Sequence, residues 1–416
     1  MLLYNIGTQI YFFLIRIASL FKPKAKLWVN GRKNLLNKID ELLSKNEQRI
    51  WIHCASLGEF EQGRPVIERL KSLHPHLKIV LTFFSPSGFE VRKNYKGADY
   101  IFYLPTDTKS NAKRFISLIK PEYVIFVKYE FWVHYINELK LNKIPLYLIS
   151  ANFREGQLFF KWYGGFYRSI LHKISHLFVQ NRNSVELLNE IGITNVTISG
   201  DTRFDRVVDI ASQTKDIPLV SLFKQNKRIL IGGSTWRKDN ELIADLINSN
   251  SLNDTKFIIA THEIHEQDIE ELINSIKVKS IRFSKADESN ISDAHVLIID
   301  NIGMLSSLYR YASVAYIGGG FGKGIHNTLE AATFGMPVLF GPNYQKFREA
   351  IELVRLGAAF PLTSSHELKD IAVDLFSDES KLNHLSEIAK NYVKINMGAT
   401  DIILDKINHL QTSFSN

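Results

Sequence analysis

The sequence predicts an α/β protein of two domains, each with a parallel sheet that is covered by helices on both faces. Short apolar runs typical of buried strands alternate with helical stretches along most of the chain. This is the pattern of repeated βαβ units. The chain is also long enough, at 416 residues, for two domains with a core each.

The first domain is expected over residues 25–217. Its predicted strands are the apolar runs at residues 49–54, 79–83, 100–104, 123–127, 146–150, 176–180 and 196–199. Polar turns follow several of these runs, as at residues 55–59 (ASLGE) and 85–88 (SPSG). Turns at the carboxyl ends of parallel strands place functional side chains at one edge of the sheet.

The second domain is expected over residues 218–395, beginning with a linker at 218–227. Its predicted strands lie at residues 228–231, 257–260, 296–299, 314–317 and 338–340. Two Rossmann-like domains of this kind are expected to bind a ligand in a cleft, at the carboxyl ends of both sets of strands. Residues 396–416 are helical in pattern, and we expect them to pack back on the first domain.

The N-terminal residues 2–21 (LLYNIGTQIYFFLIRIASLF) are mostly apolar, and Lys22, Lys24 and Lys26 follow them. No small-residue cleavage site ends this segment, so we expect no cleaved signal peptide. The segment nearly suffices to span a bilayer, but Arg16 would be costly near the centre. We expect residues 1–24 to contact the membrane, as an interfacial helix or, less favoured, as an anchor. A helix packed on the protein's own surface is the alternative.

The composition narrows the classes of partner. A formal net charge of +8 suits an anionic partner such as a phosphorylated substrate, an anionic membrane or a nucleic acid. The basic residues are spread out and no nucleic-acid-binding signature is present, so we expect no nucleic-acid partner. A single cysteine, Cys54, excludes an intrachain disulfide, and no Cys/His cluster has zinc-site spacing. No metal or cofactor is expected, and no G-x-S-x-G motif indicates a hydrolase.

The stretch at residues 317–342 (IGGGFGKGIHNTLEAATFGMPVLFGP) is the most informative part of the chain. Its strand ends at Ile317, a glycine-rich loop follows, and a helix is expected to begin near Asn327. Such a loop lets backbone N–H groups approach an anion, and the helix N-terminus adds its positive dipole end. Glu330, one turn into the helix, can reach a ribose or sugar hydroxyl. The alternative is a loop with a packing role only.

Three charged residues at predicted strand ends are candidates for catalysis. Glu59 follows a strand at the start of a helix, and is either a catalytic base that faces the cleft or a first-turn glutamate that stabilises the helix dipole. Glu130, next to Trp132, is either a site residue or a surface glutamate. Arg203 could clamp a carboxylate or phosphate, or form an interdomain salt bridge.

Polar residues in loops at strand ends of the second domain could bind a nucleotide. Ser234, Thr235, His262 and Asn327 occupy such positions. Their alternative is ordinary loop and helix-cap chemistry, which taken singly is the better interpretation.

Together these motifs resemble the 3-deoxy-D-manno-octulosonic acid (Kdo) transferase family of lipopolysaccharide synthesis. The resemblance covers nearly the whole chain. Besides the apolar N-terminus, it rests on residues 31–33 (GRK), 53–59 (HCASLGE), 82–88 (TFFSPSG), 130–132 (EFW), 200–205 (GDTRFD), 300–305 (DNIGML) and 318–342.

The resemblance implies an inverting glycosyltransferase of the GT-B fold that needs no metal. It would move Kdo from CMP-Kdo to the lipid A precursor, a tetraacyldisaccharide 4'-phosphate, at the cytoplasmic face of the inner membrane of a Gram-negative bacterium. By the resemblance, Glu59 matches the general base, and Glu130 and Arg203 match positions that stabilise the transition state. The residues that match CMP-Kdo-binding positions are Ser234, Thr261, His262, Ile302, Gly303, Met304, Gly319, Gly320, His326, Asn327, Thr328, Leu329 and Glu330.

The chain departs from the family pattern near the expected donor site. Many relatives have Glu where Lys128 and Met304 stand, Arg at Thr261, and STH where residues 234–236 read STW. These differences affect the detailed nucleotide contacts more than the reaction class. The competing functions are another GT-B enzyme that uses a UDP-sugar, either a transferase or an epimerase, and a non-catalytic membrane-surface protein that binds a glycolipid.

Overall fold

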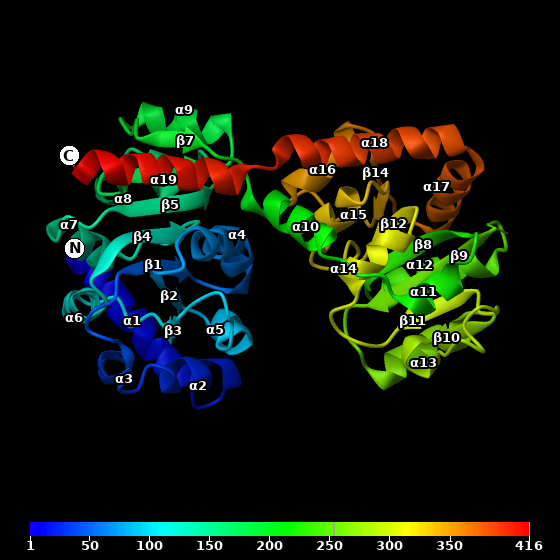
Figure 1. The fold of residues 1–416 in the computed structure, drawn as a ribbon, viewed down its shortest axis with the longest axis horizontal. Helices are drawn as coiled ribbons and strands as arrows, with labels where there is room; N and C mark the ends of the chain where they lie inside the picture. Colours follow the sequence, from blue (N-terminus) through cyan, green and yellow to red (C-terminus); the bar gives the residue numbers. More distant parts are fainter. Residues whose placement is uncertain (253, 416) are drawn as a thin grey trace. The chain divides into compact units, whose positions relative to one another are not determined.

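The computed structural model describes residues 1–252 and 254–415 as an α/β protein with two parallel sheets. The chain divides into two compact units (Figure 1). One unit comprises Met1–Arg206 and Met397–Asn416, and the other comprises Val207–Asn396. Each unit is described by itself.

The sheet of the first unit has seven strands in the order β3-β2-β1-β4-β5-β6-β7, all paired in parallel. The strands are β1 (Arg49–Cys54), β2 (Lys78–Phe83), β3 (Tyr100–Tyr103), β4 (Pro121–Val127), β5 (Leu146–Ala151), β6 (His176–Val179) and β7 (Val196–Ile198). Apolar side chains alternate between the faces, as a pleated strand requires. Trp51 packs in the core on one face, whereas Ile50 and Ile52 pack in the core on the other.

Helices cover both faces of this sheet (Figure 1). The helices of the unit are α1 (Leu2–Ala18), α2 (Pro23–Asn30), α3 (Leu35–Leu42), α4 (Leu57–Leu73), α5 (Pro86–Arg92), α6 (Lys109–Ile119), α7 (Val133–Leu141), α8 (Gly165–Leu171), α9 (Arg182–Glu190) and α19 (Ala399–Ser415), with the 3-10 turn η1 (Leu158–Phe160). Helix α10 (Thr202–Ser212) begins in this unit. Ile403, Leu404 and Ile407 of α19 lie in the same core as α4.

The sheet of the second unit also has seven parallel strands, in the order β10-β11-β9-β8-β12-β13-β14. These strands are β8 (Arg228–Thr235), β9 (Thr255–Thr261), β10 (Ser280–Arg282), β11 (Val296–Ile299), β12 (Val314–Ile317), β13 (Val338–Phe340) and β14 (Ala359–Pro361). The helices are α11 (Pro218–Lys224), α12 (Arg237–Asn248), α13 (Glu266–Ser275), α14 (Leu305–Leu308), α15 (Leu329–Thr333), α16 (Arg348–Arg355), α17 (Ser365–Ser377) and α18 (Glu379–Asn396), with the 3-10 turns η2 (Phe283–Lys285) and η3 (Tyr309–Tyr311).

The predicted α/β architecture with two parallel sheets is confirmed, and each predicted strand is present. Two edge strands of three residues each, β10 and β14, were not predicted. The predicted linker at 218–227 is wrong: most of it forms α11, whose Val220 and Phe223 are buried. The chain passes between the two units near Arg206 and again near Met397. There α18 ends and Gly398 adopts a φ of +101°, which a glycine reaches without strain.

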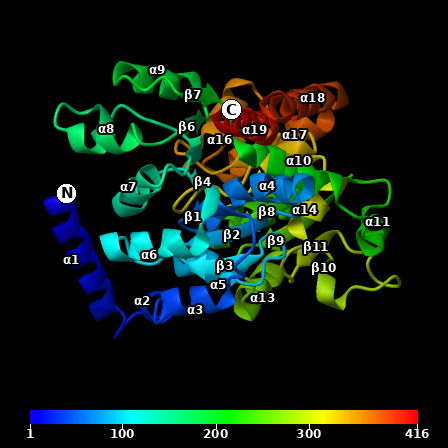
Figure 2. The same cartoon turned by 60° about the vertical axis from the view of Figure 1, so that its left-hand side comes forward.

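Helix α1 lies at the outer edge of the first unit (Figure 2). Its inner side is bonded to the unit, because the Tyr4 hydroxyl donates to Asp107 and Asn5 bonds His134 at 2.8 Å. Its outer side exposes apolar side chains such as Leu3, Phe13 and Leu14. No helix in the described part of the chain is both long and apolar enough to cross a membrane.

Candidate active site

Glu59 stands in the first turn of α4, directly after β1. Its side chain is half-buried, and one of its carboxylate oxygens accepts a hydrogen bond from the Ser56 hydroxyl. Gly58 beside it has open space around the position of a Cβ atom, with only the Ser56 hydroxyl in contact range. The carboxylate therefore lies at the carboxyl edge of the sheet, where a base that removes a proton from a ligand is expected.

Glu130 lies at the carboxyl end of β4, the neighbour of β1 in the sheet. Its Oε2 atom receives a hydrogen bond of 2.7 Å from Trp132 Nε1 and lies 3.3 Å from His53 Nε2. The Glu130 side chain is 14% exposed, whereas that of His53 is fully buried. The carboxylate is therefore held from behind and has one side open to solvent.

Polar contacts hold the His53 ring at both of its nitrogens. His53 Nδ1 lies 2.8 Å from Thr82 Oγ1 and 3.2 Å from the Thr82 carbonyl oxygen. The Thr82 hydroxyl oxygen also accepts a hydrogen bond of 2.8 Å from Trp51 Nε1, which can only donate. On the other side of the ring, His53 Nε2 accepts a hydrogen bond of 3.1 Å from Trp132 Nε1 and lies 3.3 Å from Glu130 Oε2. His53, Trp132 and Glu130 therefore form one polar cluster.

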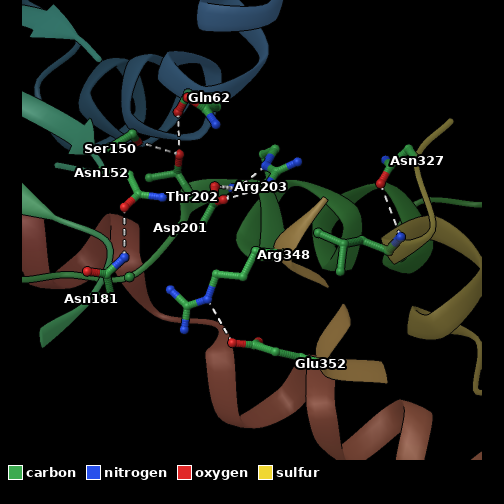
Figure 3. Close-up of polar contacts among 12 residues, drawn as sticks. Gln62, Ser150, Asn152, Asn181, Asp201, Thr202, Arg203, Asn327, Arg348 and Glu352 are labelled. Atoms are coloured by element: carbon green, nitrogen blue, oxygen red, sulfur yellow. Dashed lines mark hydrogen bonds and ion pairs between the residues drawn. The ribbon is translucent and has the colours of Figure 1, made fainter. Parts of the chain in front are cut away.

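Arg203 is oriented by Asp201 in the loop after β7. The Asp201 carboxylate accepts hydrogen bonds from Arg203 Nε at 2.9 Å, from its terminal nitrogen at 2.8 Å and from its backbone N–H at 3.0 Å (Figure 3). Such a two-pronged contact fixes the plane of the guanidinium. The Arg203 side chain remains 35% exposed.

The first turn of α10, which carries Arg203, is tied to other elements of the first unit by Thr202. The Thr202 hydroxyl donates to the Gln62 carbonyl of α4 at 2.6 Å and lies 3.1 Å from the Ser150 hydroxyl of β5 (Figure 3). Ser150 and Lys128, both at strand ends, have φ angles of +56° and +64°. Non-glycine residues rarely adopt this conformation, and it concentrates at functional sites. The structure thus brings the elements of Glu59, Glu130 and Arg203 to one edge of the first sheet.

In the second unit, the glycine loop after β12 packs tightly against the ends of neighbouring strands. A Cβ atom on Gly318 would lie 2.2 Å from the Ser234 carbonyl oxygen, and one on Gly320 would lie 2.6 Å from the Gly341 Cα. Gly319 has a φ of +92°. Glycine is therefore required at these positions for close packing of the backbone.

The amides of this loop are engaged within the chain. Gly318 N–H bonds the Gly233 carbonyl and Gly319 N–H bonds Asp239 Oδ2, both at 2.9 Å. Gly322 and Gly324 both donate to the Gly319 carbonyl, and Gly319 and Gly320 are buried. The amides of Gly318, Gly319, Gly322 and Gly324 thus have partners within the chain, and anion binding by this loop stays a prediction. The expected helix is also short, because α15 has only five residues.

The remaining predicted donor-site residues differ in their accessibility. Asn327 and Ser306 hold Glu330, with donor–acceptor distances of 3.0 and 2.8 Å. Thr328 and Leu329 have buried side chains, so a ligand contact through these side chains is not supported. Ile302 and Gly303 form an exposed loop after β11, followed by the partly buried Met304. Ser234 and Thr261 are partly buried at the ends of β8 and β9, and Ser234 has a φ of +53°.

His262 and His326 form a stack with Trp236 at the ends of β8, β9 and β12. The His262 ring centroid lies 4.2 Å from that of His326 and 4.6 Å from that of Trp236. Trp236 Nε1 donates to His326 Nε2 at 3.0 Å, so His326 is neutral with its proton on Nδ1. Burial, and then the nearby His262, lower the pKa of His326, which agrees with this assignment.

Three residues of these sites were not predicted as site residues: His53, Trp236 and Asp239. Buried Asp239 accepts hydrogen bonds from the backbone of Gly319 and Trp236 and from the Tyr316 hydroxyl. A polar residue near a helix start was the only signal for Asp239, since many helices carry one as a cap. His53 was predicted only as part of a buried strand. A histidine inside an apolar run is itself a signal, because a buried imidazole needs hydrogen-bond partners.

Comparison with solved structures defines the fold class. A UDP-GlcNAc 2-epimerase from Neisseria meningitidis bound to UDP-GlcNAc aligns with a TM-score of 0.60 and 17% identity, covering 87% of this chain and 100% of that one. MurG from Acinetobacter baumannii aligns with a TM-score of 0.55 and 14% identity, covering 87% and 99%. These proteins show the fold alone, and they confirm the α/β architecture with two parallel sheets of the GT-B class.

Comparison with sequences shows which proteins this chain is similar to. The model of the 3-deoxy-D-manno-octulosonic-acid transferase (kdotransferase) family matches residues 30–206. Relatives called 3-deoxy-D-manno-octulosonic acid transferase include those of Rickettsia typhi (25% identity, covering 94% of this chain and 85% of the relative), Haemophilus influenzae (27%, 86% and 86%) and Aquifex aeolicus (28%, 82% and 90%). The chain is therefore similar to Kdo transferases over most of its length.

Proposed function

We propose that this protein transfers Kdo from CMP-Kdo to the lipid A precursor, a tetraacyldisaccharide 4'-phosphate, at the cytoplasmic face of the inner membrane. One observation carries the proposal: the family match at residues 30–206 contains Glu59, Glu130 and Arg203. The positions of these residues support the match, because all three charged groups stand at one edge of the first sheet.

The proposed reaction is a direct displacement at the anomeric carbon of Kdo. Glu59 takes the proton of the acceptor hydroxyl while the hydroxyl oxygen forms a bond to that carbon. The bond from the carbon to the phosphate oxygen breaks, and CMP leaves with the electron pair. Glu130, supported by Trp132 and His53, faces the positive charge that develops on the sugar ring. Arg203, oriented by Asp201, meets negative charge on the donor.

The donor phosphate needs cationic partners, because most amides of the glycine loop are already bonded. A hollow of about 630 Å³ next to His326 and Trp236 is lined by Arg237, Lys238 and Lys323. We place the phosphate of CMP-Kdo at this hollow. Lys323→Ala should then raise the KM for CMP-Kdo more than the KM for the acceptor.

The proposed acceptor is a membrane lipid, and helix α1 suits contact with the interface. Its outer face exposes Leu3, Phe13 and Leu14, and the exposed Lys22, Lys24 and Lys26 follow the helix. Apolar side chains can enter the headgroup region while the lysines contact anionic lipids.

The test is an assay of the purified chain with CMP-Kdo and the lipid A precursor in detergent and in vesicles. Wild type and Glu59→Gln are compared, with EDTA present. Product from wild type and a loss of about a hundredfold or more in the variant support the proposal. The mass of the product gives the number of Kdo residues added. No product from wild type in either medium would overturn it.

The competing functions have distinct outcomes in the same assay. Turnover of a UDP-sugar in place of CMP-Kdo would identify another GT-B transferase or an epimerase. Binding of the glycolipid by wild type and Glu59→Gln alike, with no turnover of any donor, would identify a non-catalytic membrane-surface protein.

A further inference from the structure

An apolar groove of about 670 Å³ runs between helix α1 and the residues around α8. Figure 2 shows α1 at the outer edge of the unit that contains the groove. The groove is lined by Met1, Leu2, Leu3, Tyr4, Gly7, Thr8, Tyr11, Phe12, Trp132, Phe166 and Tyr167. Its volume is within the usual range of small-molecule sites, about 300–1,000 Å³.

The groove presents a mostly apolar surface to a ligand. None of the lining residues, all of them described, has a charged side chain. The polar atoms of its central residues also have partners elsewhere. The Tyr4 hydroxyl donates to Asp107, the Thr8 hydroxyl donates to the Asn5 carbonyl at 3.0 Å, and Trp132 Nε1 donates to Glu130. A polar ligand would therefore find few free hydrogen-bonding groups, whereas an alkyl chain needs no hydrogen bonds in the groove.

Trp132 joins the groove to the candidate active site. Its ring lines the groove, while its Nε1 atom is 2.7 Å from the carboxylate of Glu130. The same ring packs at 4.6 Å against Phe84. One end of a molecule that lies along the groove would thus contact Trp132, whose side chain bonds Glu130.

The groove is preformed, because the first turns of α1 are fixed to α7. The Tyr4 hydroxyl bonds the buried Asp107 and also lies 3.4 Å from the Val133 amide. Asn5 bonds His134, and Asp107 accepts the amides of His134 and Tyr135, each at 3.2 Å. A wall that is already ordered does not add a large ordering cost to binding.

We propose that this groove holds one acyl chain of the acceptor glycolipid and so places its sugar headgroup at Glu130. The inference rests on the proposed function and adds a position for the acceptor. It is favoured over a free bilayer lipid because the groove ends at the catalytic carboxylate. The charge pattern also fits, since no side chain that lines the groove is charged. The exposed Arg16 in the last turn of α1 and the exposed Lys22 after the helix lie farther along the chain, where an anionic headgroup region would meet them.

The test fills the groove from Gly7. No atom lies within 4 Å of the position of a Gly7 Cβ, so Gly7→Phe adds a ring to open space. Ile6→Phe is the matched control, because Ile6 is 48% exposed and does not line the groove. Phe166→Trp narrows the groove from the opposite wall, in case Gly7→Phe fails to fold. Thermal unfolding and flotation with anionic vesicles are measured for each variant.

Each variant is assayed with the tetraacyl acceptor and with the same bisphosphorylated disaccharide after removal of its acyl chains. Gly7→Phe and Phe166→Trp should raise the KM for the acylated acceptor by about tenfold or more, since several methylene groups lose their burial. The KM for CMP-Kdo, turnover of the deacylated acceptor and vesicle binding should match those of Ile6→Phe.

Two results would overturn the inference. In the first, the filled variants use the acylated acceptor as well as Ile6→Phe does. In the second, they lose activity equally on both acceptors. Both differ from a failure of the proposed function, in which wild type forms no product from either acceptor.

Discussion

Replacement of His53 tests whether its ring, whose Nε2 atom lies 3.3 Å from Glu130 Oε2, supports that carboxylate. His53→Asn and His53→Gln form a matched pair, since both remove the ring from a fully buried position. In His53→Asn, the shorter side chain keeps an amide near the position of Nδ1, next to Thr82, but this amide does not reach Glu130. Gln can extend an N–H donor toward the carboxylate. A purely structural role for the histidine predicts equal damage in the two variants.

The expected magnitude follows from the distances at Glu130 Oε2. Hydrogen bonds to charged groups contribute about 1.5–3 kcal/mol. The contact from His53 is long at 3.3 Å and belongs at the weak end of that range, whereas the contact from Trp132 is short at 2.7 Å. Loss of about 1.4 kcal/mol from the transition state lowers kcat about tenfold. Trp132→Phe should therefore cost more than His53→Asn.

The assay is the steady-state transfer reaction with both substrates varied, supported by urea unfolding of each variant. We expect His53→Asn to lower kcat about tenfold at little change in KM, and His53→Gln to recover part of the loss. The pH profile of kcat should differ between the two variants, because only one can place a donor at Glu130. Equal kcat values in the two variants would refute the reasoning.

Three further predictions concern the glycine loop, the core and the exposed residues that follow α1. Gly318→Ala should destabilise the protein by about 2 kcal/mol or more in urea unfolding, because its Cβ would lie 2.2 Å from the Ser234 carbonyl oxygen; an unchanged midpoint would contradict the packing role. Burial, and then Lys406, lower the pKa of His176 to about 4. The folded state thus favours the neutral ring, and stability should fall by up to about 3 kcal/mol as the pH drops from about 6.5 to 4; His176→Gln should flatten that curve. Leu20, which is 76% exposed, should contribute to vesicle binding, so Leu20→Asp should weaken flotation with anionic vesicles while activity on a deacylated acceptor persists.

The sequence could predict which residues reach the same edge of a sheet. Glu59 and Glu130 follow β1 and β4, and the alternation of apolar runs with polar turns placed both at strand ends. The neighbouring positions of β1 and β4 make the two ends adjacent in space. Periodicity carries this information because parallel strands share one direction.

Side-chain partners could not be predicted in the same way. Residues 318–324 contain five glycines among seven residues. This composition indicates a loop whose backbone packs closely against another group, but it does not tell whether that group is a phosphate or the backbone of the next strand. In the structure, the Gly318 N–H group donates to the Gly233 carbonyl and the Gly319 N–H group donates to Asp239. That outcome depends on the path of α12, which lies far from the loop in sequence. His53 is similar, since the direction of its ring is determined by Thr82 and Trp51.

The N-terminal residues 2–21 show what three-dimensional contacts add to a sequence-based prediction. Length and composition left open an interfacial helix, an anchor and a helix packed on the protein's own surface. In the structure, α1 ends at Ala18, and its first turns bond Asp107 and His134. A spanning helix would have to leave these partners. Asp107 is 1% exposed, and burial raises the pKa of its carboxyl, so the loss of the Tyr4 hydroxyl would leave a costly buried group. The bonded inner side therefore argues against a spanning helix, whereas contact of the outer side with lipid stays a prediction. Tyr4→Phe should loosen α1 without removing any exposed apolar side chain.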